Sequence, residues 1–406
     1  MRHVYMATGS PAAVVRVRSG AEVPDALAFA LAHDGPFAVR SGGHGISSIA
    51  TNVGGAVIDL SRLDDIELLG GRRVRIGAGA RWGQVAQALY PHGLALSSGD
   101  SGDVGVGGLA TAGGIGLLGR RYGLTIDHLV AAEMVTADGA VRRVSAEDEP
   151  DLFWAIRGAG ANFGVVTAFE FDAAPTPTVG QGLFLYRPKD LPGFLEQWGR
   201  TVERAPREIT AFLVLDGPIA SATVAYAGDD PKAMTAAMEP FTTLPGLSAG
   251  EARTVPYPRL PVTTGDVHRG QQPARVRTGL AVHLDLETAR RIADFAGDME
   301  MVQIRSVGGA INDVPADATA YAHRHQNFSV TAVSYAERSA LDAAWAPVRE
   351  RMDGLYLSFE SDHTPASVSD AFPEPTLTRL RALKEKWDPG RVFTQNFDLG
   401  TNRPEA

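Results

Sequence analysis

The chain of 406 residues contains no cysteine, and this absence narrows its chemistry before any motif is considered. Disulfides, thiolate metal sites, cysteine nucleophiles and any cysteinyl bond to a cofactor are all excluded. The absence fits a reducing compartment, although an exported protein can also lack cysteine. The start of the chain carries no apolar segment typical of a secretion signal. We therefore expect a cytoplasmic protein.

The sequence also lacks an excess of basic residues and an apolar run of membrane-spanning length. Lys and Arg total 38 against 47 Asp and Glu, which gives a net charge of −9 at pH 7. Binding to nucleic acid phosphates requires clustered positive charge, and crossing a bilayer requires about 20 consecutive apolar residues. We therefore expect neither nucleic acid nor a membrane as a partner, and a small molecule as the substrate. The sequence does not indicate an oligomeric state.

Length and glycine distribution predict an α+β fold with two domains. A chain of 406 residues is long for a single core. Residues 10–172 are rich in glycine and alternate short β-type runs with helical patterns, whereas residues 178–370 alternate strands with longer amphipathic helices. The segment Pro175-Thr176-Pro177 separates the two parts. We place the domains at 1–175 and 176–371, the second an antiparallel sheet covered by helices.

The second part has the clearest periodicity. Strands are predicted at Leu183–Tyr186, Ile209–Leu215, Ala222–Ala227, Leu280–Leu284, Val302–Ile304, Phe328–Tyr335 and Leu355–Phe359. Helices are predicted at Phe194–Val202, Pro231–Glu239, Glu287–Phe295, Ser339–Met352 and Thr376–Lys386.

Two glycine-rich segments are the strongest candidates for a ligand site. The first is Val39-Arg40-Ser41-Gly42-Gly43-His44-Gly45, and the second runs from Gly99 to Gly116. Glycine lets the backbone approach a ligand closely, and successive N–H groups can form a concave anion site. The first loop places one imidazole beside the ligand. The second, with few bulky side chains, suits a pyrophosphate and a flat ring.

Other readings of these and similar motifs stay open at this point. Gly105–Ala110 matches the G-x-G-x-x-A fingerprint of a Rossmann fold, with Asp127 at a suitable distance, but a polar turn and not a strand precedes it. A purely structural glycine turn is the other alternative. Gly246–Gly250 matches a hydrolase nucleophile elbow, but its context favours a loop. His323-Arg324-His325 has no nearby carboxylate cluster, so no metal site is expected.

Further motifs, in the same order along nearly the whole chain, resemble one family. They are Arg40–His44, Val104–Gly108, Tyr122-Gly123-Leu124 with Asp127, Asp151–Gly158, Asn162–Thr167, Trp387-Asp388-Pro389, Val392-Phe393 and Gln395-Asn396. The chain resembles the berberine bridge enzyme-like FAD-linked oxidases of the vanillyl-alcohol oxidase superfamily. The resemblance implies a PCMH-type FAD-binding fold, FAD as the cofactor in the first domain, and a return of residues 372–406 to that domain.

The resemblance also implies how FAD is held. His44 matches the histidine that bonds covalently to the flavin 8α-methyl group, and Ser101 stands where many relatives have a cysteine that forms a second bond. A single histidyl link is therefore the most that this chain can form. The implied cofactor-binding residues are Arg40, Ser41, Gly42, Gly43, His44, Gly45, Gly99, Asp100, Val104, Gly105, Gly107, Gly108, Thr111, Gly114, Gly116, Val166 and Asn396.

Catalytic residues are less well defined by the resemblance. Tyr356-Leu357-Ser358-Phe359 resembles the family's Tyr-x-Asn-Tyr strand, but only Tyr356 is retained. A phenol with a pKa of about 10 is a poor base unless a nearby cation lowers that pKa. Arg324 or a flanking histidine is a candidate for this cation, and Tyr321 is an alternative phenol. For both tyrosines, the role of an ordinary packed aromatic stays open.

The implied reaction is hydride transfer from an alcohol or amine of a small organic substrate to FAD. A secondary metabolite, an alkaloid and a sugar fit equally well. Val104 matches the position that the family uses as an oxygen gate, which favours an oxidase that forms H2O2. A dehydrogenase or oxidative cyclase with another acceptor is the alternative, and a non-catalytic flavin-binding protein is a third.

Overall fold

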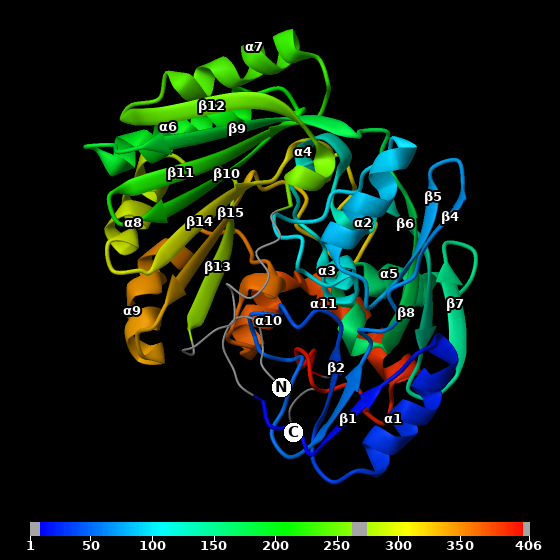
Figure 1. Cartoon of the computed structure of the whole chain (residues 1–406). Coiled ribbons are helices and arrows are strands. Elements are labelled where there is room, and N and C mark those ends of the chain that lie inside the picture. The colour runs from blue at the N-terminus through cyan, green and yellow to red at the C-terminus, as the bar shows by residue number, and fades with distance from the viewer. Residues whose placement is uncertain (1–8, 262–273, 401–406) are drawn as a thin grey trace.

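The computed structural model describes residues 9–261 and 274–400, and their strands form three sheets (Figure 1). The smallest sheet is parallel, with the order β1-β3-β2. These strands are β1 (Ala13–Arg16), β3 (Ala56–Asp59) and β2 (Phe37–Arg40), and helix α1 (Val23–Ala32) packs against β3. The first glycine-rich loop leaves directly from the end of β2, so this sheet fixes where the loop begins.

The second sheet is antiparallel and has the order β4-β5-β8-β6-β7. Its strands are β4 (Ile66–Gly70), β5 (Arg73–Gly77), β8 (Val165–Asp172), β6 (Leu129–Val135) and β7 (Val141–Ser145). The associated helices are α2 (Trp82–Leu89), α3 (Val106–Ala112), α4 (Gly119–Tyr122) and α5 (Pro150–Ala159). The strands and helices α2, α3 and α5 share one core, in which the Trp82 and Phe171 rings lie 6.1 Å apart, whereas Tyr122 of α4 packs against a separate hydrophobic cluster.

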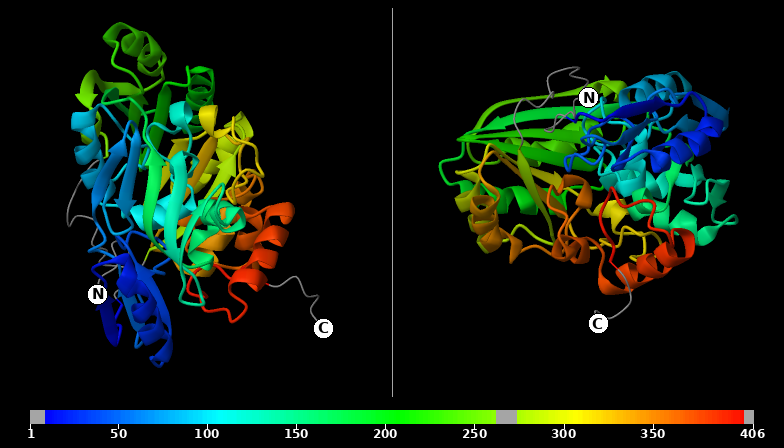
Figure 2. Two further views of the ribbon diagram at one scale, coloured as in Figure 1. Left: turned by 90° about the vertical axis from the view of Figure 1, so that its right-hand side faces the viewer. Right: turned by 90° about the horizontal axis from the view of Figure 1, so that it is seen from below.

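The third sheet has seven antiparallel strands in the order β12-β9-β11-β10-β14-β15-β13. They are β12 (Leu247–Pro256), β9 (Thr178–Tyr186), β11 (Ile219–Tyr226), β10 (Ile209–Asp216), β14 (Met301–Ser306), β15 (Phe328–Ser334) and β13 (Arg275–Ala281). Helices cover one face of it (Figures 1 and 2). They are α6 (Leu191–Arg204), α7 (Pro231–Thr242), α8 (Leu286–Ala296) and α9 (Arg338–Arg349).

Side-chain alternation gives the central strands of this sheet two different faces. Leu213, Ile304 and Val330 are in register and pack into the core beneath the helices. Their neighbours Phe212 and Arg305 are also in register and belong to the opposite face, because successive residues of a strand point to opposite sides. That face is turned toward the other half of the molecule and carries the polar side chains discussed below.

Acidic caps fix where three of the covering helices begin. Asp190, Asp230 and Asp285 accept hydrogen bonds from backbone N–H groups in the first turns of α6, α7 and α8. A side-chain oxygen at this position satisfies donors that the helix itself leaves unpaired, which stabilises a helix by about 0.5–2 kcal/mol.

The last part of the chain returns to the first half. Helix α10 (Pro365–Ala371) is followed by α11 (Glu374–Trp387), which contacts α5. Beyond α11, Phe393 packs edge-on against Phe37 of β2, with the ring centroids 6.1 Å apart. The C-terminal segment therefore lies in the same core as the strands of the first sheet.

The structure confirms the α+β fold and corrects three local predictions. The strand expected at Leu280–Leu284 is displaced, since β13 spans Arg275–Ala281. Leu357–Phe359 forms a single 3-10 turn (η8) instead of a strand, because its residues cap the end of a pocket and pair with no neighbouring strand. The segment Gly246–Gly250, expected as a loop, enters the edge strand β12. That strand is exposed along most of its length, so it lacks the alternation by which strands are identified. The five predicted helices correspond to α6, α7, α8, α9 and α11.

The chain passes from the second sheet to the third between Asp172 and Thr178, at the proline-containing segment. The domain boundaries drawn from the sequence stay a prediction. Within the described ranges, none of the helices has the length and apolar run that crossing a membrane requires.

Candidate functional site

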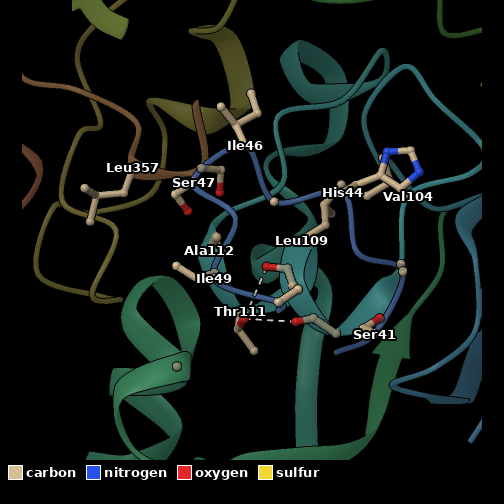
Figure 3. Close-up of a pocket in the computed structure, with 18 of the residues that line it drawn as sticks. Ser41, His44, Ile46, Ser47, Ile49, Val104, Leu109, Thr111, Ala112 and Leu357 are labelled. Atoms are coloured by element: carbon tan, nitrogen blue, oxygen red, sulfur yellow. Dashed lines mark hydrogen bonds between the residues drawn. The ribbon is translucent and has the colours of Figure 1, made fainter. Parts of the chain in front are cut away.

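A pocket lies where the two glycine-rich segments face the third sheet (Figure 3). The first segment contributes Ser41 to Ala50, and the second contributes residues between Gly99 and Ile115. Arg305 of β14, the turn from Tyr356 to Phe359, and Gln395 to Phe397 complete its wall. Figure 3 shows His44 and Val104 at one end of this pocket and Leu357 at the other.

The two glycine segments meet by direct backbone contact. A Cβ atom added to Gly42 would lie 2.4 Å from the Gly105 nitrogen, and one added to Gly105 would lie 2.2 Å from the Gly42 nitrogen. Only glycine fits at either position, because neither backbone can retreat like a flexible side chain. Ser41 Oγ donates to the Ala78 carbonyl at 2.7 Å, which ties the first loop to the chain beyond β5. The loops are thus held as one rigid cradle.

Fourteen of the seventeen predicted cofactor-binding residues line the pocket. The three exceptions are Arg40, Gly114 and Gly116. Arg40 ends β2 beneath the loop, and the absence of a side chain at Gly43 leaves room for its guanidinium. Gly114 and Gly116 are required by close packing instead, because a Cβ there would lie 2.2 Å from Thr125 Oγ1 and 2.5 Å from Ser97 Oγ. Gly114 and Gly116 therefore allow the close packing that supports the cradle.

Sequence reasoning missed several lining residues. Most are small or aliphatic and carry no chemical signal; they include Ile46, Ile49, Leu109, Ala112, Ile115, Gly160 and Val165. Arg305 is the exception, because its charge directly after the predicted strand Val302–Ile304 was a detectable signal. The sequence could not show which face of that strand it occupies.

Buried polar atoms in the pocket wall lack partners within the described part of the chain. They are Ser101 Oγ, Gln395 Oε1, Asn396 Oδ1 and Arg305 Nη1. A buried polar atom left unpaired is costly, so such atoms mark places where a ligand or water is received. Together with the bare glycine surface, they fit a long, flat ligand with several polar groups. A flavin dinucleotide meets this description.

Tyr356 is the one predicted catalytic residue that lines the pocket. Its hydroxyl oxygen accepts a hydrogen bond from the Gly114 backbone N–H at 3.0 Å, and Ser358 also hydrogen-bonds to it. Burial nevertheless raises the pKa of Tyr356 above its ordinary value, because a buried phenolate loses its hydration. The side chain is therefore a neutral phenol at physiological pH.

Tyr321 and Arg324 lie behind Tyr356 and are not among the lining residues. Arg324 donates to both carboxylate oxygens of Asp127, at 2.8 and 2.9 Å, and its guanidinium carbon lies 5.2 Å from the Tyr321 ring centroid. Burial is the largest influence on Tyr321 and raises its pKa, although the Arg324 charge opposes this. Arg324 is thus already paired with Asp127, and its role as the activating cation stays a prediction.

The structure also shows where the residues of the remaining alternatives lie. Asp127, the acidic residue of the Rossmann alternative, pairs with Arg324, and the segment before Gly105 is a turn outside any βαβ unit. His323 is buried and lies away from the pocket; its Nε2–H donates to the carbonyls of Asp370 and Ala371 at 3.0 Å. Across residues 9–261 and 274–400, no cluster of three His, Asp or Glu side chains could hold a metal ion.

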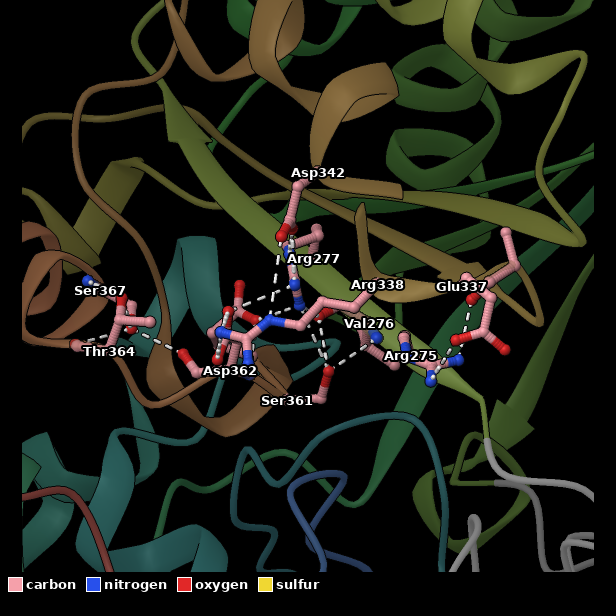
Figure 4. A network of polar contacts seen from close by, with 12 residues as sticks. Arg275, Val276, Arg277, Glu337, Arg338, Asp342, Ser361, Asp362, Thr364 and Ser367 are labelled. Atoms are coloured by element: carbon pink, nitrogen blue, oxygen red, sulfur yellow. Dashed lines mark hydrogen bonds and ion pairs between the residues drawn. The ribbon is translucent and has the colours of Figure 1, made fainter. Parts of the chain in front are cut away.

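A charged network braces the pocket turn from outside (Figure 4). Glu360, the residue after η8, accepts hydrogen bonds from Arg277 Nη1 at 2.9 Å and from the Asp362 N–H at 2.8 Å. Arg277 also bonds Asp342 at 2.6 Å. Burial raises the pKa of Glu360 to about 7, against the opposing influence of Arg277. This network attaches the turn to β13, and the turn in turn holds Tyr356 in place.

Comparison with known proteins identifies the ligand class. Residues 11–145 match a protein family that is described as an FAD binding domain. An FAD-linked oxidoreductase of Metarhizium anisopliae is 29% identical over 425 residues, covering 94% of this chain and 83% of the relative.

Two solved structures have the same fold. 6-Hydroxy-D-nicotine oxidase from Arthrobacter nicotinovorans superposes with a TM-score of 0.86 at 25% identity, covering 97% of this chain and 93% of that one. Glucooligosaccharide oxidase from Acremonium strictum, described with a 6-S-cysteinyl, 8α-N1-histidyl FAD, superposes with a TM-score of 0.83 at 22% identity, covering 97% and 92%. This second likeness bears on the fold alone.

The fold and the glycine cradle therefore define an FAD-binding protein of the PCMH type. More particularly, the chain is similar to FAD-linked oxidoreductases and oxidases, and the resemblance found in the sequence is confirmed. It is an FAD-dependent enzyme of the oxidoreductase class.

Proposed function

We propose that this enzyme is an oxidase that carries FAD on a single bond to His44 and passes electrons from a small alcohol or amine to O2, forming H2O2. FAD held in the cradle supplies the two-electron acceptor for hydride from the substrate carbon. The observation that carries the proposal is the convergence of His44, Ser101 and Val104 on one pocket.

His44 supports the tether because its loop can place an imidazole at only one end of the cradle. The Gly42–Gly105 contact fixes the loop, and Gly43 has a φ of 72°, a left-handed conformation that favours glycine. The related glucooligosaccharide oxidase is described with one histidyl and one cysteinyl bond to FAD. Ser101 lines this pocket, and the chain contains no cysteine, so the second bond cannot form here.

Tyr356 is proposed as the catalytic residue that contacts the substrate. Its oxygen receives hydrogen bonds from the Gly114 N–H and from Ser358, which leaves its own O–H available to a substrate oxygen or nitrogen. Both donors favour the phenolate, and burial opposes it. The residue therefore holds a proton in the resting enzyme, and it orients the substrate before it takes part in proton transfer.

Val104 supports oxygen as the acceptor. It lines the pocket at the same end as His44, and its side chain is small enough to leave access beside the cofactor. Replacing Val104 with Leu is expected to slow reoxidation of substrate-reduced enzyme by air while leaving anaerobic reduction unchanged. If reoxidation in the wild type is slow compared with turnover, the enzyme is a dehydrogenase or cyclase that uses another acceptor.

The tether is tested by denaturing and washing the purified protein. Wild-type protein should stay yellow, and His44→Ala should release its flavin on denaturation. His92→Ala, at an exposed histidine outside the pocket, is the matched control and should keep the colour. Loss of colour from denatured wild-type protein would overturn the covalent assignment. A protein that binds FAD but shows no turnover with any alcohol or amine would be a flavin carrier.

A further inference from the structure

Arg305 is a buried arginine that faces the pocket and is only partly paired. Its side chain projects from the C-terminal end of β14 on the face turned away from the covering helices, and it is 6% exposed. One nitrogen, Nη2, lies 3.3 Å from Asp100 Oδ2. The other, Nη1, has no hydrogen-bond partner within residues 9–261 and 274–400. A buried guanidinium N–H of this kind needs an acceptor.

The guanidinium is held in a fixed orientation. Its carbon lies 4.1 Å from the ring centroid of Phe359 and 5.5 Å from that of Phe212, so two aromatic rings flank it. Asp100 is in turn held by Gln303, whose Nε2 donates to the same Oδ2 at 3.0 Å. Such bracing leaves Arg305 little freedom to turn Nη1 toward another protein group. The unpaired nitrogen is therefore a preformed donor.

The surroundings define the chemistry that this donor can recognise. Within the part of the pocket wall that the structure describes, two side chains are of the Asp, Glu, Lys or Arg type: Asp100 and Arg305. Asp100 also accepts a hydrogen bond from Gln303. The Phe359 ring lies against Arg305, and Leu357 is a further apolar residue of the same wall. A planar guanidinium binds carboxylates more strongly than neutral oxygen acceptors, because the hydrogen bond is charge-assisted on both sides.

We propose that Arg305 binds a carboxylate of the substrate, and that the enzyme acts on a small, largely apolar molecule that carries this group. This assignment rests on the proposed function, because it concerns the substrate side of the same pocket. Arg305 is then a specificity-determining residue. It selects the acid over its neutral analogues and positions the rest of the molecule beside Tyr356.

The test uses the FAD-loaded protein and two probes of equal shape, benzoate and benzamide. Binding is followed by the change in flavin absorbance, so neither turnover nor an electron acceptor is required. Wild-type protein should bind benzoate about 10- to 100-fold more tightly than benzamide. Arg305→Met should remove this preference, and Arg305→Lys should retain part of it because the charge remains while the planar fork is lost.

Arg207→Met is the matched control, because it removes an exposed arginine that pairs with Asp313 outside the pocket. It should keep the full preference for benzoate. Equal binding of both probes to the wild type, no spectral response to either probe, or an unchanged preference in Arg305→Met would each overturn the proposal. An Arg305→Met flavin spectrum that shifts without any probe, with benzoate affinity retained, would place the guanidinium against FAD instead.

Failure of the proposed oxidase reaction would be seen separately, as an absence of peroxide or of flavin reduction. It would leave the probe titration readable. If Arg305→Met does not fold, the Arg305→Lys variant still decides the matter through its ratio of benzoate to benzamide affinity.

Discussion

Replacing Arg324 with Met should destabilise the enzyme strongly, because it removes one partner of a buried ion pair. Arg324 and Asp127 are joined by two hydrogen bonds of 2.8 and 2.9 Å, and their side chains are 3% and 9% exposed. The substitution leaves the Asp127 carboxylate buried with a hydrogen bond from the Leu124 N–H and no ion-pair partner in contact, while Arg157 still attracts it from a greater distance. Arg324 also donates to Thr319, so a further acceptor loses its donor.

The size of the effect follows from the burial of the pair. Removing one member of a buried pair costs about 3–5 kcal/mol, because the remaining charge is desolvated without compensation. Unfolding entropy scales with chain length at about 2.1 cal/mol/K per residue, so 406 residues give about 0.9 kcal/mol/K. The expected decrease in Tm is therefore about 4–6 °C.

The assay is thermal unfolding of the FAD-loaded protein followed by circular dichroism. Arg324→Met, Asp127→Asn and the double variant form a cycle in which the double variant should lose less than the sum of the single losses, since no buried charge is left alone. Arg200→Met is the control, because Arg200 pairs with Glu196 at the surface of α6. Exposed pairs contribute about 0–1 kcal/mol, so its Tm should change by at most about 1 °C.

A different outcome would refute this reasoning. If Arg324 instead lowers the pKa of a phenol that acts as the catalytic base, Arg324→Met should leave Tm near the wild-type value and move the acidic limb of the pH–rate profile, where activity rises with pH, to higher pH. Additive losses in the cycle would also contradict a direct ion pair.

Three further predictions concern the pocket and its support. Burial raises the folded-state pKa of Glu360 to about 7. The residue therefore contributes stability that is present below its unfolded pKa of about 4.5 and is lost as the pH rises through 7. Glu360→Gln should flatten the dependence of Tm on pH in that range. Gly42→Ala should reduce flavin loading and stability because its Cβ would meet the Gly105 backbone at 2.4 Å, whereas Gly297→Ala, with nothing within 4 Å, should change neither flavin content nor Tm. Tyr356→Phe should lower kcat by about 10²- to 10⁴-fold with flavin content unchanged, and a variant with wild-type kcat would exclude this phenol from catalysis.

The proposed role of Arg305 adds a practical consequence. The altered turn after Tyr356 places a phenylalanine beside the guanidinium, so the substrate side of the pocket combines one charge with an apolar wall. Screens with sugars alone would miss an acid substrate of this kind. Aromatic and aliphatic hydroxy or amino acids are the better first panel.

Short-range chemistry made the cofactor site predictable from the sequence. Glycines at Gly42, Gly43 and Gly105 are informative because they permit close backbone contact or a left-handed conformation wherever the fold places them. Because the chain has no cysteine, the sequence alone excludes a second, cysteinyl bond to FAD. Amphipathic periodicity likewise located the covering helices, since one face of each must be apolar to pack on a sheet.

Only the tertiary structure decided what the charged residues do. Arg324 and Asp127 are 197 residues apart in sequence, and their pairing depends on how the two halves of the chain pack. The direction of Arg305 depends on strand register, because a shift of one residue would turn its side chain from the pocket to the opposite face. The sequence by itself thus determined the cofactor and the fold class, whereas burial and register, which depend on distant contacts, decided which charges are compensated and which one is left to meet the substrate.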